Sequence, residues 1–390
     1  MNFDILFAII FYLLLIIFYL KNKKKFEIQG GIFALYRTKL GLKLMDKIAK
    51  KFPKSLNFIG YISIVVGFAG MILILYTLIQ GTYKLVLGYL GIIPQSPPVI
   101  APVLPGISVQ GLPVLSFWHW IIAIFIVAVI HEFAHGVYSR LAKVKIKSSG
   151  FAFLGPILAA FVEPDEEELK KVGTRKNLAM VSAGPFINIV LAFIVILFFN
   201  FLFVPLQSGL LSVDGVKLVN VETNSPADIA GMKAGLIIKD INGIPLNSQN
   251  DLVNEIQKSK QSDVLKINTD KGNYYVKPDF SQNKPKIGIS VENNLVVKRG
   301  PQFLLPIISW LNMLFFWLWV ISLGIGLFNL LPLGPIDGGR LLYSGLLGIT
   351  TIKRSKKIFG FVTFLSAFLI FINLIPWLIK LFKFFIQLIF

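Results

Sequence analysis

The stretch that decides the fold is Phe117–Tyr138, FWHWIIAIFIVAVIHEFAHGVY, an apolar run of membrane-spanning length that carries ionisable residues near its end. His131 and His135 are four residues apart, and on an α-helix such residues share one face, about 6 Å apart along the axis. Glu132 lies beside them. Ionisable side chains inside a membrane span are costly, so their presence indicates a functional site.

The spacing HExxH is a metal-hydrolase motif, because two imidazoles on one helix face reach a single metal ion while the glutamate lies next to it. A lone histidine in an apolar helix is more often a hydrogen-bonded structural residue. Here the chain has only three histidines and two of them fall within five residues, so chance is a poor explanation. The third, His119, is about 18 Å from His131 along the helix. We expect it to be an interfacial polar group outside the site.

The composition is typical of a polytopic membrane protein. Apolar residues make up 55% of the chain, mean hydropathy is +0.72 and charged residues make up 15%. The absence of cysteine excludes disulfides, thiolate metal ligands and a cysteine nucleophile. Six segments are long and apolar enough to span a bilayer. They are residues 3–20, 57–79, 117–138, 177–203, 303–331 and 358–379.

Lysine and arginine alternate between the loops that join these spans. Segment 21–56 carries eleven basic and two acidic residues, segment 139–176 carries eight basic residues, and segment 80–116 carries only Lys84. By the positive-inside rule, 21–56, 139–176 and 340–357 are cytoplasmic and both termini are outside. The net charge of +19 is therefore a signal of topology and lipid attraction, and we expect no nucleic-acid partner.

A catalytic zinc site needs a third protein ligand and an open position for water. Asp337 is the only carboxylate in the ninety residues from Pro301 to Phe390, and prolines and a glycine pair around it break the helix. The charge pattern brings Asp337 and the two histidines to similar depth on the cytoplasmic side. A helix cap or an ion pair to Arg340 is the alternative role.

With these motifs the sequence resembles the site-2 protease family of intramembrane zinc metalloproteases. The resemblance rests on HEFAH at 131–135 together with Asn329-Leu-Leu-Pro-Leu-Gly-Pro-Ile-Asp337-Gly-Gly. A third matching element is Gly184-Pro-Phe-Ile-Asn188 in the fourth span. The resemblance covers about residues 117–345.

The resemblance implies a role for each matching residue. His131, His135 and Asp337 would bind Zn²⁺, and Glu132 would be the general base and acid. Asn329 would face the scissile carbonyl, with a helix cap or a bond within the bundle as its alternative. Asn188 would contact the substrate backbone, although asparagine also forms hydrogen bonds between spans.

Loop 139–176 predicts a small β-hairpin at 145–162, dipping into the inner membrane face, with Ser148-Ser149-Gly150 as its turn. An edge strand there would pair with an unwound substrate. The acidic residues at 163–168 predict the start of a solvated helix. Segment 26–56 predicts an amphipathic stretch on the inner membrane surface.

Segment 207–297 changes character and holds half of the acidic residues of the chain. Ser225 and Ser248 read as helix caps, and Asn242-Gly243 reads as a tight hairpin turn. The run SPADIAGMKAGLIIKDINGIPL resembles a PDZ domain of the protease-associated type. Its groove would take an extended peptide or a free carboxyl terminus, and a purely steric filter is the alternative.

The sequence thus predicts a polytopic α-helical membrane protein with an inserted extracytoplasmic PDZ-like α+β domain and a cytoplasmic-side re-entrant β-hairpin. Its expected parts are the N-terminal spans at 1–116, the catalytic membrane core at 117–206 and 298–390, and the PDZ-like domain at 207–297. We expect a multi-pass protein of the cell membrane whose active site lies near the cytoplasmic side.

The expected function is hydrolysis of a peptide bond within or near transmembrane segments of membrane proteins. The expected partners are membrane-embedded protein substrates, the lipid bilayer and a protease that cuts the substrate first. Another class of HExxH membrane protease takes a glutamate from a later helix as third ligand, but no glutamate follows Glu292. A zinc-free PDZ-bearing scaffold or a transporter remains the non-enzyme alternative, and the sequence shows no internal repeat typical of a transporter.

Overall fold

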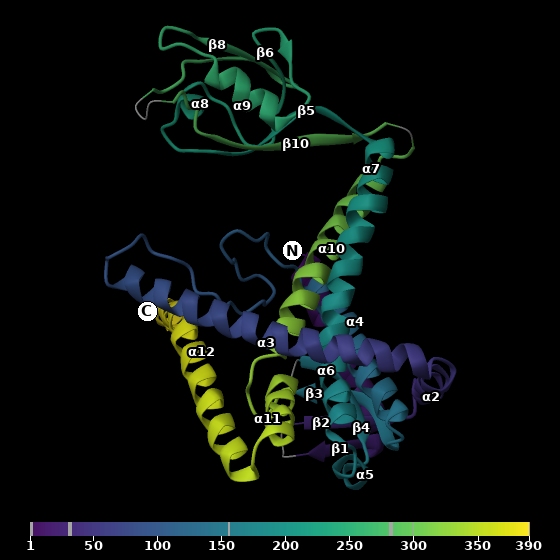
Figure 1. Cartoon of the computed structure of the whole chain (residues 1–390). Coiled ribbons are helices and arrows are strands. Elements are labelled where there is room, and N and C mark those ends of the chain that lie inside the picture. Colours follow the sequence, from purple (N-terminus) through teal and green to yellow (C-terminus); the bar gives the residue numbers. More distant parts are fainter. Residues whose placement is uncertain (1–2, 30–32, 155–156, 281–283, 299, 390) are drawn as a thin grey trace. The chain divides into compact units, whose positions relative to one another are not determined.

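The computed structural model describes residues 3–29, 33–154, 157–280, 284–298 and 300–389 (Figure 1). The chain divides into two compact units. Met1–Leu197 and Met313–Phe390 together form one unit, here called the membrane unit. Phe198–Asn312 forms the other, here called the inserted unit.

Six helices in the described residues are long and apolar enough to cross a membrane, which confirms the six predicted spans and a polytopic membrane protein. Several extend past the predicted limits; the 37 residues of the second span measure about 55 Å, more than the roughly 30 Å hydrocarbon core. The fourth continues through a π-helix at Phe199–Phe203 into α7, Val204–Leu210. The spanning helices are α1 (Phe3–Asn22), α3 (Pro53–Tyr89), α4 (Phe117–Leu141), α6 (Thr174–Phe198), α10 (Leu304–Phe328) and α12 (Ile352–Ile389).

A four-stranded antiparallel sheet lies at one end of the membrane unit, next to α5 (Glu166–Lys170) (Figure 1). Its strands, in spatial order, are β1 (Phe26–Gln29), β2 (Phe33–Thr38), β3 (Ile146–Leu154) and β4 (Ile157–Pro164). The predicted hairpin is therefore present as β3 and β4, and β4 is an edge strand. Strand β4 packs along α4, the helix that carries the HExxH motif.

Segment 26–56 differs from one expectation. It follows a short 3₁₀ turn at Lys23–Lys25 and forms β1, β2 and α2 (Leu42–Lys51) instead of one amphipathic stretch on the membrane surface. The backbone groups of β2 pair with β3, which supplies hydrogen-bond partners that a surface-lying strand would lack. Helix α2 buries Leu42 and Met45 against Val137 of α4.

The predicted turn at Ser148-Ser149-Gly150 is wrong, because these residues lie inside β3. Ser148 Oγ donates to Glu163 and Ser149 Oγ donates to the carbonyl of Leu40, so both serines bridge neighbouring segments. A methyl group at Gly150 would overlap the carbonyl oxygen of Tyr36 in β2. The glycine therefore marks the close approach of two strands and not a change of chain direction.

The fifth span ends in a bend that positions the next helix. Residues 329–336 are not helical, and α11 (Asp337–Ile349) begins directly at Asp337. The backbone N–H of Gly338 donates to the carbonyl of Asn329 over 2.6 Å, closing the bend. A methyl group at Gly338 would collide with the backbone of Leu330 and Leu331. Asp337 is thus held at the tip of a tight turn.

The inserted unit is an α+β fold around one apolar core. Asn242 and Gly243 have positive φ of 53° and 81° between β6 and β7, as a tight turn requires. Ser225 and Ser248 accept backbone N–H groups at the starts of the two helices, as expected of caps. The strands are β5 (Leu211–Val221), β6 (Ile237–Ile241), β7 (Ile244–Pro245), β8 (Leu265–Thr269), β9 (Gly272–Val276) and β10 (Ile289–Val297), in the order β10-β5-β6-β8-β9 with β7 on β6, and the helices are α8 (Pro226–Ile229) and α9 (Gln249–Gln257).

Candidate metal centre

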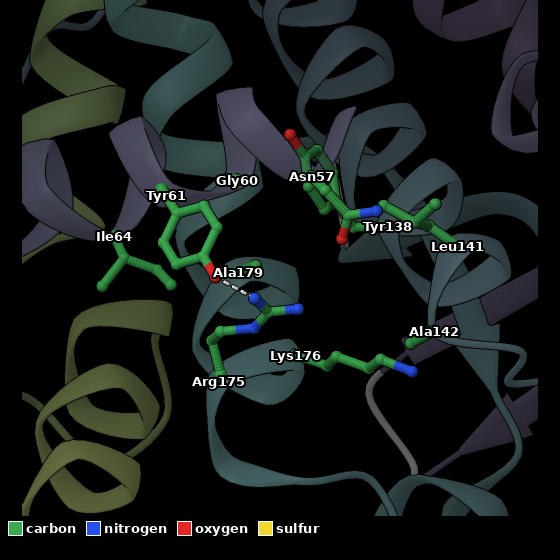
Figure 2. A pocket seen from close by; sticks show the side chains of 10 residues that line it. All are labelled: Asn57, Gly60, Tyr61, Ile64, Tyr138, Leu141, Ala142, Arg175, Lys176 and Ala179. Atoms are coloured by element: carbon green, nitrogen blue, oxygen red, sulfur yellow. Dashed lines mark hydrogen bonds between the residues drawn. The ribbon is translucent and has the colours of Figure 1, made fainter. Parts of the chain in front are cut away.

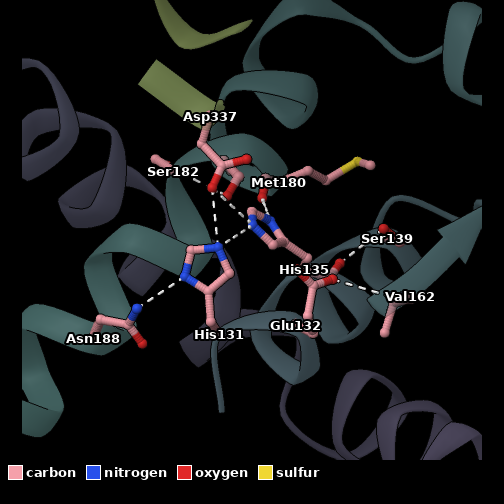
Figure 3. A network of polar contacts seen from close by, with 10 residues as sticks. His131, Glu132, His135, Ser139, Val162, Met180, Ser182, Asn188 and Asp337 are labelled. Carbon is pink, nitrogen blue, oxygen red and sulfur yellow. Dashed lines mark hydrogen bonds and ion pairs between the residues drawn. The ribbon is translucent and has the colours of Figure 1, made fainter. Parts of the chain in front are cut away.

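Three side chains that are far apart in the sequence converge in the membrane unit (Figure 3). His131 and His135 come from α4, and Asp337 is the first residue of α11. The two Nε2 atoms are 3.1 Å apart, and Asp337 Oδ2 lies 3.1 Å from His131 Nε2 and 3.2 Å from His135 Nε2. All three side chains are largely buried. Within the described residues, these are Asp337's ion-pair partners, and Arg340 is not one of them.

The spacing of these atoms fits a zinc ion. Tetrahedral ligands at 2.0–2.1 Å from Zn²⁺ lie about 3.3 Å from one another. The three observed separations of 3.1, 3.1 and 3.2 Å match that edge length closely. Two neutral imidazoles and one carboxylate are also a donor set that zinc accepts in catalytic sites. His131, His135 and Asp337 would therefore hold the ion and leave its fourth position open.

Helix α6 supports the two histidines through one face. Met180, Gly184 and Asn188 follow one another at intervals of four residues, so they line up on that face. The carbonyl oxygen of Met180 lies 2.7 Å from His135 Nδ1 and accepts its proton. This bond leaves His135 Nε2 unprotonated and directed at the metal position. A backbone carbonyl is a usual outer partner of a zinc-bound imidazole.

Gly184 leaves the space in which the ligand atoms meet. A methyl group at this position would lie 2.3 Å from His135 Nε2 and 2.6 Å from His131 Nε2. Those are the nitrogens that face the metal position, so a side chain here would displace ligand atoms and ion together. Glycine is required at this position by close approach and not by backbone conformation.

Asn188 lies on the far side of His131 from the metal position (Figure 3). Its side chain is completely buried, and Nδ2 lies 3.0 Å from His131 Nδ1. Its Oδ1 has no hydrogen-bond partner among the described residues. The resemblance implies that Asn188 contacts substrate backbone, whereas the contact seen here is to a metal-ligand histidine.

Glu132, the expected general base, faces the edge strand of the sheet. Its Oε2 accepts a hydrogen bond of 3.1 Å from the backbone N–H of Val162 in β4. The carboxylate is thereby held by the backbone of the strand that borders the site.

A cleft of about 790 Å³ joins the metal centre to this strand. Glu132, His135 and Asp337 lie along it, and so do residues 161–164 of β4. Such a volume is in the usual range of ligand sites. Its wall combines candidate ligand side chains and the expected base with the outer edge of β4, which is suited to an extended peptide.

Two further residues considered in the sequence, Asn329 and His119, are not among the three candidate ligands. Asn329 lies at the start of the bend before α11, and its backbone carbonyl helps to close that bend. His119 lies outside the metal centre: it is buried, 7% exposed, and its Nδ1 lies 2.6 Å from Oγ of Ser116, the cap of α4.

A second recess lies between the ends of α3, α4 and α6 (Figure 2). It is lined by Tyr61, Arg175 and Lys176, among others, and it contains no carboxylate and no histidine. The Arg175 guanidinium lies over the Tyr61 ring and donates to its hydroxyl. Its volume of about 20 Å³ accommodates roughly one water molecule, so it is not a substrate site.

Sequence reasoning missed two supporting groups, the carbonyl of Met180 and the N–H of Val162. Both are backbone groups, which every residue carries, so no residue type marks them. The four-residue spacing of Met180, Gly184 and Asn188 was the available signal, since it repeats the spacing of the histidines that they face.

The fold and the site together define a class: a polytopic membrane protein with a buried two-histidine, one-aspartate metal centre and an adjacent glutamate. The family model described as Peptidase family M50 matches residues 119–372. The chain therefore belongs to peptidase family M50, the family of the site-2 proteases, and is an intramembrane zinc metalloprotease. This confirms the resemblance found in its motifs.

Three proteins are similar in sequence to this chain, and two of them are named zinc metalloproteases. An uncharacterized protein of Methanocaldococcus jannaschii is 29% identical over 334 residues, covering 83% of this chain and 80% of the relative. Zinc metalloprotease RasP of Shouchella clausii is 23% identical, covering 56% of this chain and 62% of RasP. RasP of Bacillus licheniformis is 24% identical, covering 62% of this chain and 68% of RasP.

Solved PDZ domains are also similar to part of the chain. The PDZ domain of an SdrC-like protein from Listeria monocytogenes is 28% identical, covers 20% of this chain and 87% of that domain, and has a TM-score of 0.19. The corresponding domain from Listeria innocua is 23% identical, covers 23% of this chain and 99% of that domain, and has a TM-score of 0.18.

Proposed function

We propose that this metalloprotease cleaves a membrane-embedded protein substrate within or near a transmembrane segment, while an extended piece of the substrate pairs with strand β4. The observation that carries the proposal is the single cleft that contains Glu132, His135 and Asp337 together with the edge of β4. The same cleft thus offers groups for chemistry and a template for binding.

The chain's own residues supply the proton transfers. Bound Zn²⁺ would polarise the peptide carbonyl and lower the pKa of the attacking water. Glu132 removes a proton from that water and later delivers it to the leaving amine. The N–H of Val162 holds the Glu132 carboxylate beside the cleft until substrate arrives. Asn329, at the bend before Asp337, is proposed to face the scissile carbonyl.

Strand pairing addresses a physical obstacle, because peptide bonds in a helix are engaged in its own hydrogen bonds and shielded from attack. Unwinding exposes backbone groups that need new partners in a membrane. The Val162 N–H points away from β3, and successive residues of a strand alternate sides. Leu158 and Ala160 therefore present their backbone groups on the same free edge, where an unwound substrate segment would pair.

The charge pattern supports a proposed orientation. By the positive-inside rule, the basic loops favour an orientation with the metal centre toward the cytoplasm and residues 207–297 outside. We assign the inserted unit as a PDZ-like domain on its sequence run and its α+β fold, with a role in selecting substrates that another protease has already shortened. Deleting residues 210–295 with a short linker should then preserve cleavage of small substrates and admit bulkier ones. Loss of all activity in a folded, zinc-loaded deletion would contradict this role.

The central experiment compares wild type with Glu132→Gln in proteoliposomes that contain single-span test proteins. The glutamine keeps the shape of the side chain and leaves all three proposed ligands, so zinc content should remain unchanged. Cleavage should fall by roughly 10²–10⁴-fold, because the base is lost. Equal cleavage by both proteins would contradict the proposed chemistry. Failure of wild type to bind zinc would favour the zinc-free scaffold.

A further inference from the structure

We propose that Asn188 is a positioning residue of the metal centre, which holds the His131 ring with its proton on Nδ1 and its Nε2 free for Zn²⁺. The inference deepens the proposed function, because it assigns a task within the same site. It differs from the substrate contact that the resemblance implies for this residue.

Each of the two histidines is supported by a residue of α6. His131 and His135 are one helical turn apart on α4, and they face the side of α6 on which Met180, Gly184 and Asn188 follow one another at four-residue intervals. The Met180 carbonyl meets His135 Nδ1, and two turns later the Asn188 carboxamide meets His131 Nδ1. Each ring therefore has one outer partner on α6, and Gly184 leaves the room between them.

The protonation of the imidazole ring decides which kind of group must face Nδ1. A neutral ring carries one proton, so a ring that binds metal through Nε2 has that proton on Nδ1. The group facing Nδ1 must then be an acceptor. The two ends of a carboxamide have the same shape, so a half-turn of the Asn188 amide replaces Nδ2 with Oδ1 at 3.0 Å from Nδ1. The half-turn gives Oδ1 this partner and moves Nδ2 to the position that has no partner among the described residues.

Asn188 is held in place by contacts with α10. The hydroxyl of Ser322 on α10 donates to the Asn188 backbone carbonyl over 2.8 Å, and both residues are fully buried. A methyl group at Gly326 would lie only 3.2 Å from Asn188 Cβ, so α10 packs directly against this part of α6. Asn188 has no exposed surface, and removing its amide would leave the His131 N–H unpaired in a buried place.

The test measures zinc affinity of the purified full-length protein by competition with a chelator, without any substrate. Asn188→Leu has the same branched arrangement of heavy atoms but no acceptor, and it should weaken zinc binding by roughly 10–100-fold, as losses of such outer partners do. Asn188→Asp keeps an acceptor and has no N–H₂ group to leave unpaired, so it should bind zinc at least as tightly as wild type. Ser182→Ala is the matched control, since Ser182 is a buried polar residue of α6 that bonds to Ser63 and not to a histidine.

A spectroscopic readout tests the tautomer directly. The chain has only three histidines, so ¹⁵N labelling of histidine gives six ring nitrogens in all. In zinc-loaded wild type and in Asn188→Asp, His131 Nδ1 should appear protonated, and in Asn188→Leu the His131 signals should shift or broaden. Assignment by His119→Gln leaves the metal centre intact, because His119 bonds to Ser116.

Two outcomes would overturn the inference. One is wild-type zinc affinity and an unchanged His131 tautomer in folded Asn188→Leu. The other is a folded Asn188→Asp variant that binds zinc roughly 10–100-fold more weakly than wild type, which would also decide the question if Asn188→Leu failed to fold. A raised KM with normal zinc binding in Asn188→Leu would establish a substrate contact instead. Zinc affinity and the His131 tautomer are measured without cleavage, so these two readouts are separate from the test of the proposed function.

Discussion

The backbone N–H of Val162 donates a hydrogen bond of 3.1 Å to Oε2 of Glu132, which links the free edge of β4 to the proposed general base. An amide on a strand edge is also what an incoming peptide strand uses for pairing. Substrate pairing and placement of the base therefore involve the same atom. Since Val162 lies two residues before Pro164, which has no N–H, it is the last donor on this part of the edge.

Replacing one proposed ligand should remove zinc. Asp337→Ala is expected to lower bound zinc toward zero, because only two ligands would remain and both are neutral. Elemental analysis of purified protein measures this directly. Arg340→Ala is a suitable control, since Arg340 lies one turn away on α11 and forms no ion pair with Asp337 in the described structure. Stoichiometric zinc in Asp337→Ala would mean that the third ligand has been wrongly identified.

A single methyl group at Gly184 should also weaken zinc binding, for a steric reason. Gly184→Ala would place a carbon 2.3 Å from His135 Nε2, so the ligands must move apart and zinc affinity should fall by at least the roughly 10–100-fold of an outer-partner loss. The control is Gly324→Ala, where an added methyl meets nothing within 4 Å. Chelator competition compares the two variants. Equal zinc affinity in both would show that the centre tolerates the displacement.

Proline in β4 should weaken substrate handling and leave the metal in place. Ala160→Pro removes an outward backbone donor, which costs about 1 kcal/mol or roughly fivefold in kcat/KM. Ala159→Pro instead removes a donor that faces β3 and should destabilise the sheet itself. Cleavage rates, zinc content and thermal stability together separate the two effects. Unaltered kcat/KM in Ala160→Pro would argue against pairing on this edge.

Two carboxylates at the start of α5, Asp165 and Glu168, should make this region sensitive to acid. The Glu168 N–H donates to Asp165, and the Lys145 N–H donates to Glu168, so the pKa of each carboxyl lies below its usual value. A depressed folded pKa contributes stability above the unfolded pKa, near 4, and that stability is lost as pH falls through the folded pKa. The Tm difference between wild type and Asp165→Ala should therefore be largest at pH 5–6 and shrink below pH 4. A difference that grows in acid would contradict this sign.

Single cysteines can map the orientation, because the chain has none of its own. Ser262→Cys lies in the inserted unit and Lys356→Cys lies at the start of α12, and both side chains are exposed. A membrane-impermeant maleimide added to intact cells should label the first and reach the second only after lysis. The reverse pattern would reject the proposed orientation of both the inserted unit and the metal centre.

The sequence determined what depends on local pattern and on residue identity. Spans follow from continuous apolar length, and the ligand pair on α4 follows from helical spacing, so six spans, His131 and His135 were predictable. Scarcity singled out Asp337, the one carboxylate in the last ninety residues. Caps at Ser225 and Ser248 and the turn at Asn242-Gly243 are also local, and the structure has them.

Tertiary structure decided what depends on partners distant in the chain. Strands β1 and β2 were not foreseen, because β1 pairs only with β2 and β2 pairs with β3, more than a hundred residues away. For the same reason Gly150 was taken for a turn residue, when it permits two strands to approach. The Met180 carbonyl and the Val162 N–H act through backbone atoms that no sequence pattern distinguishes. Only packing of α6 and β4 against α4 brings those atoms to the histidine and the glutamate.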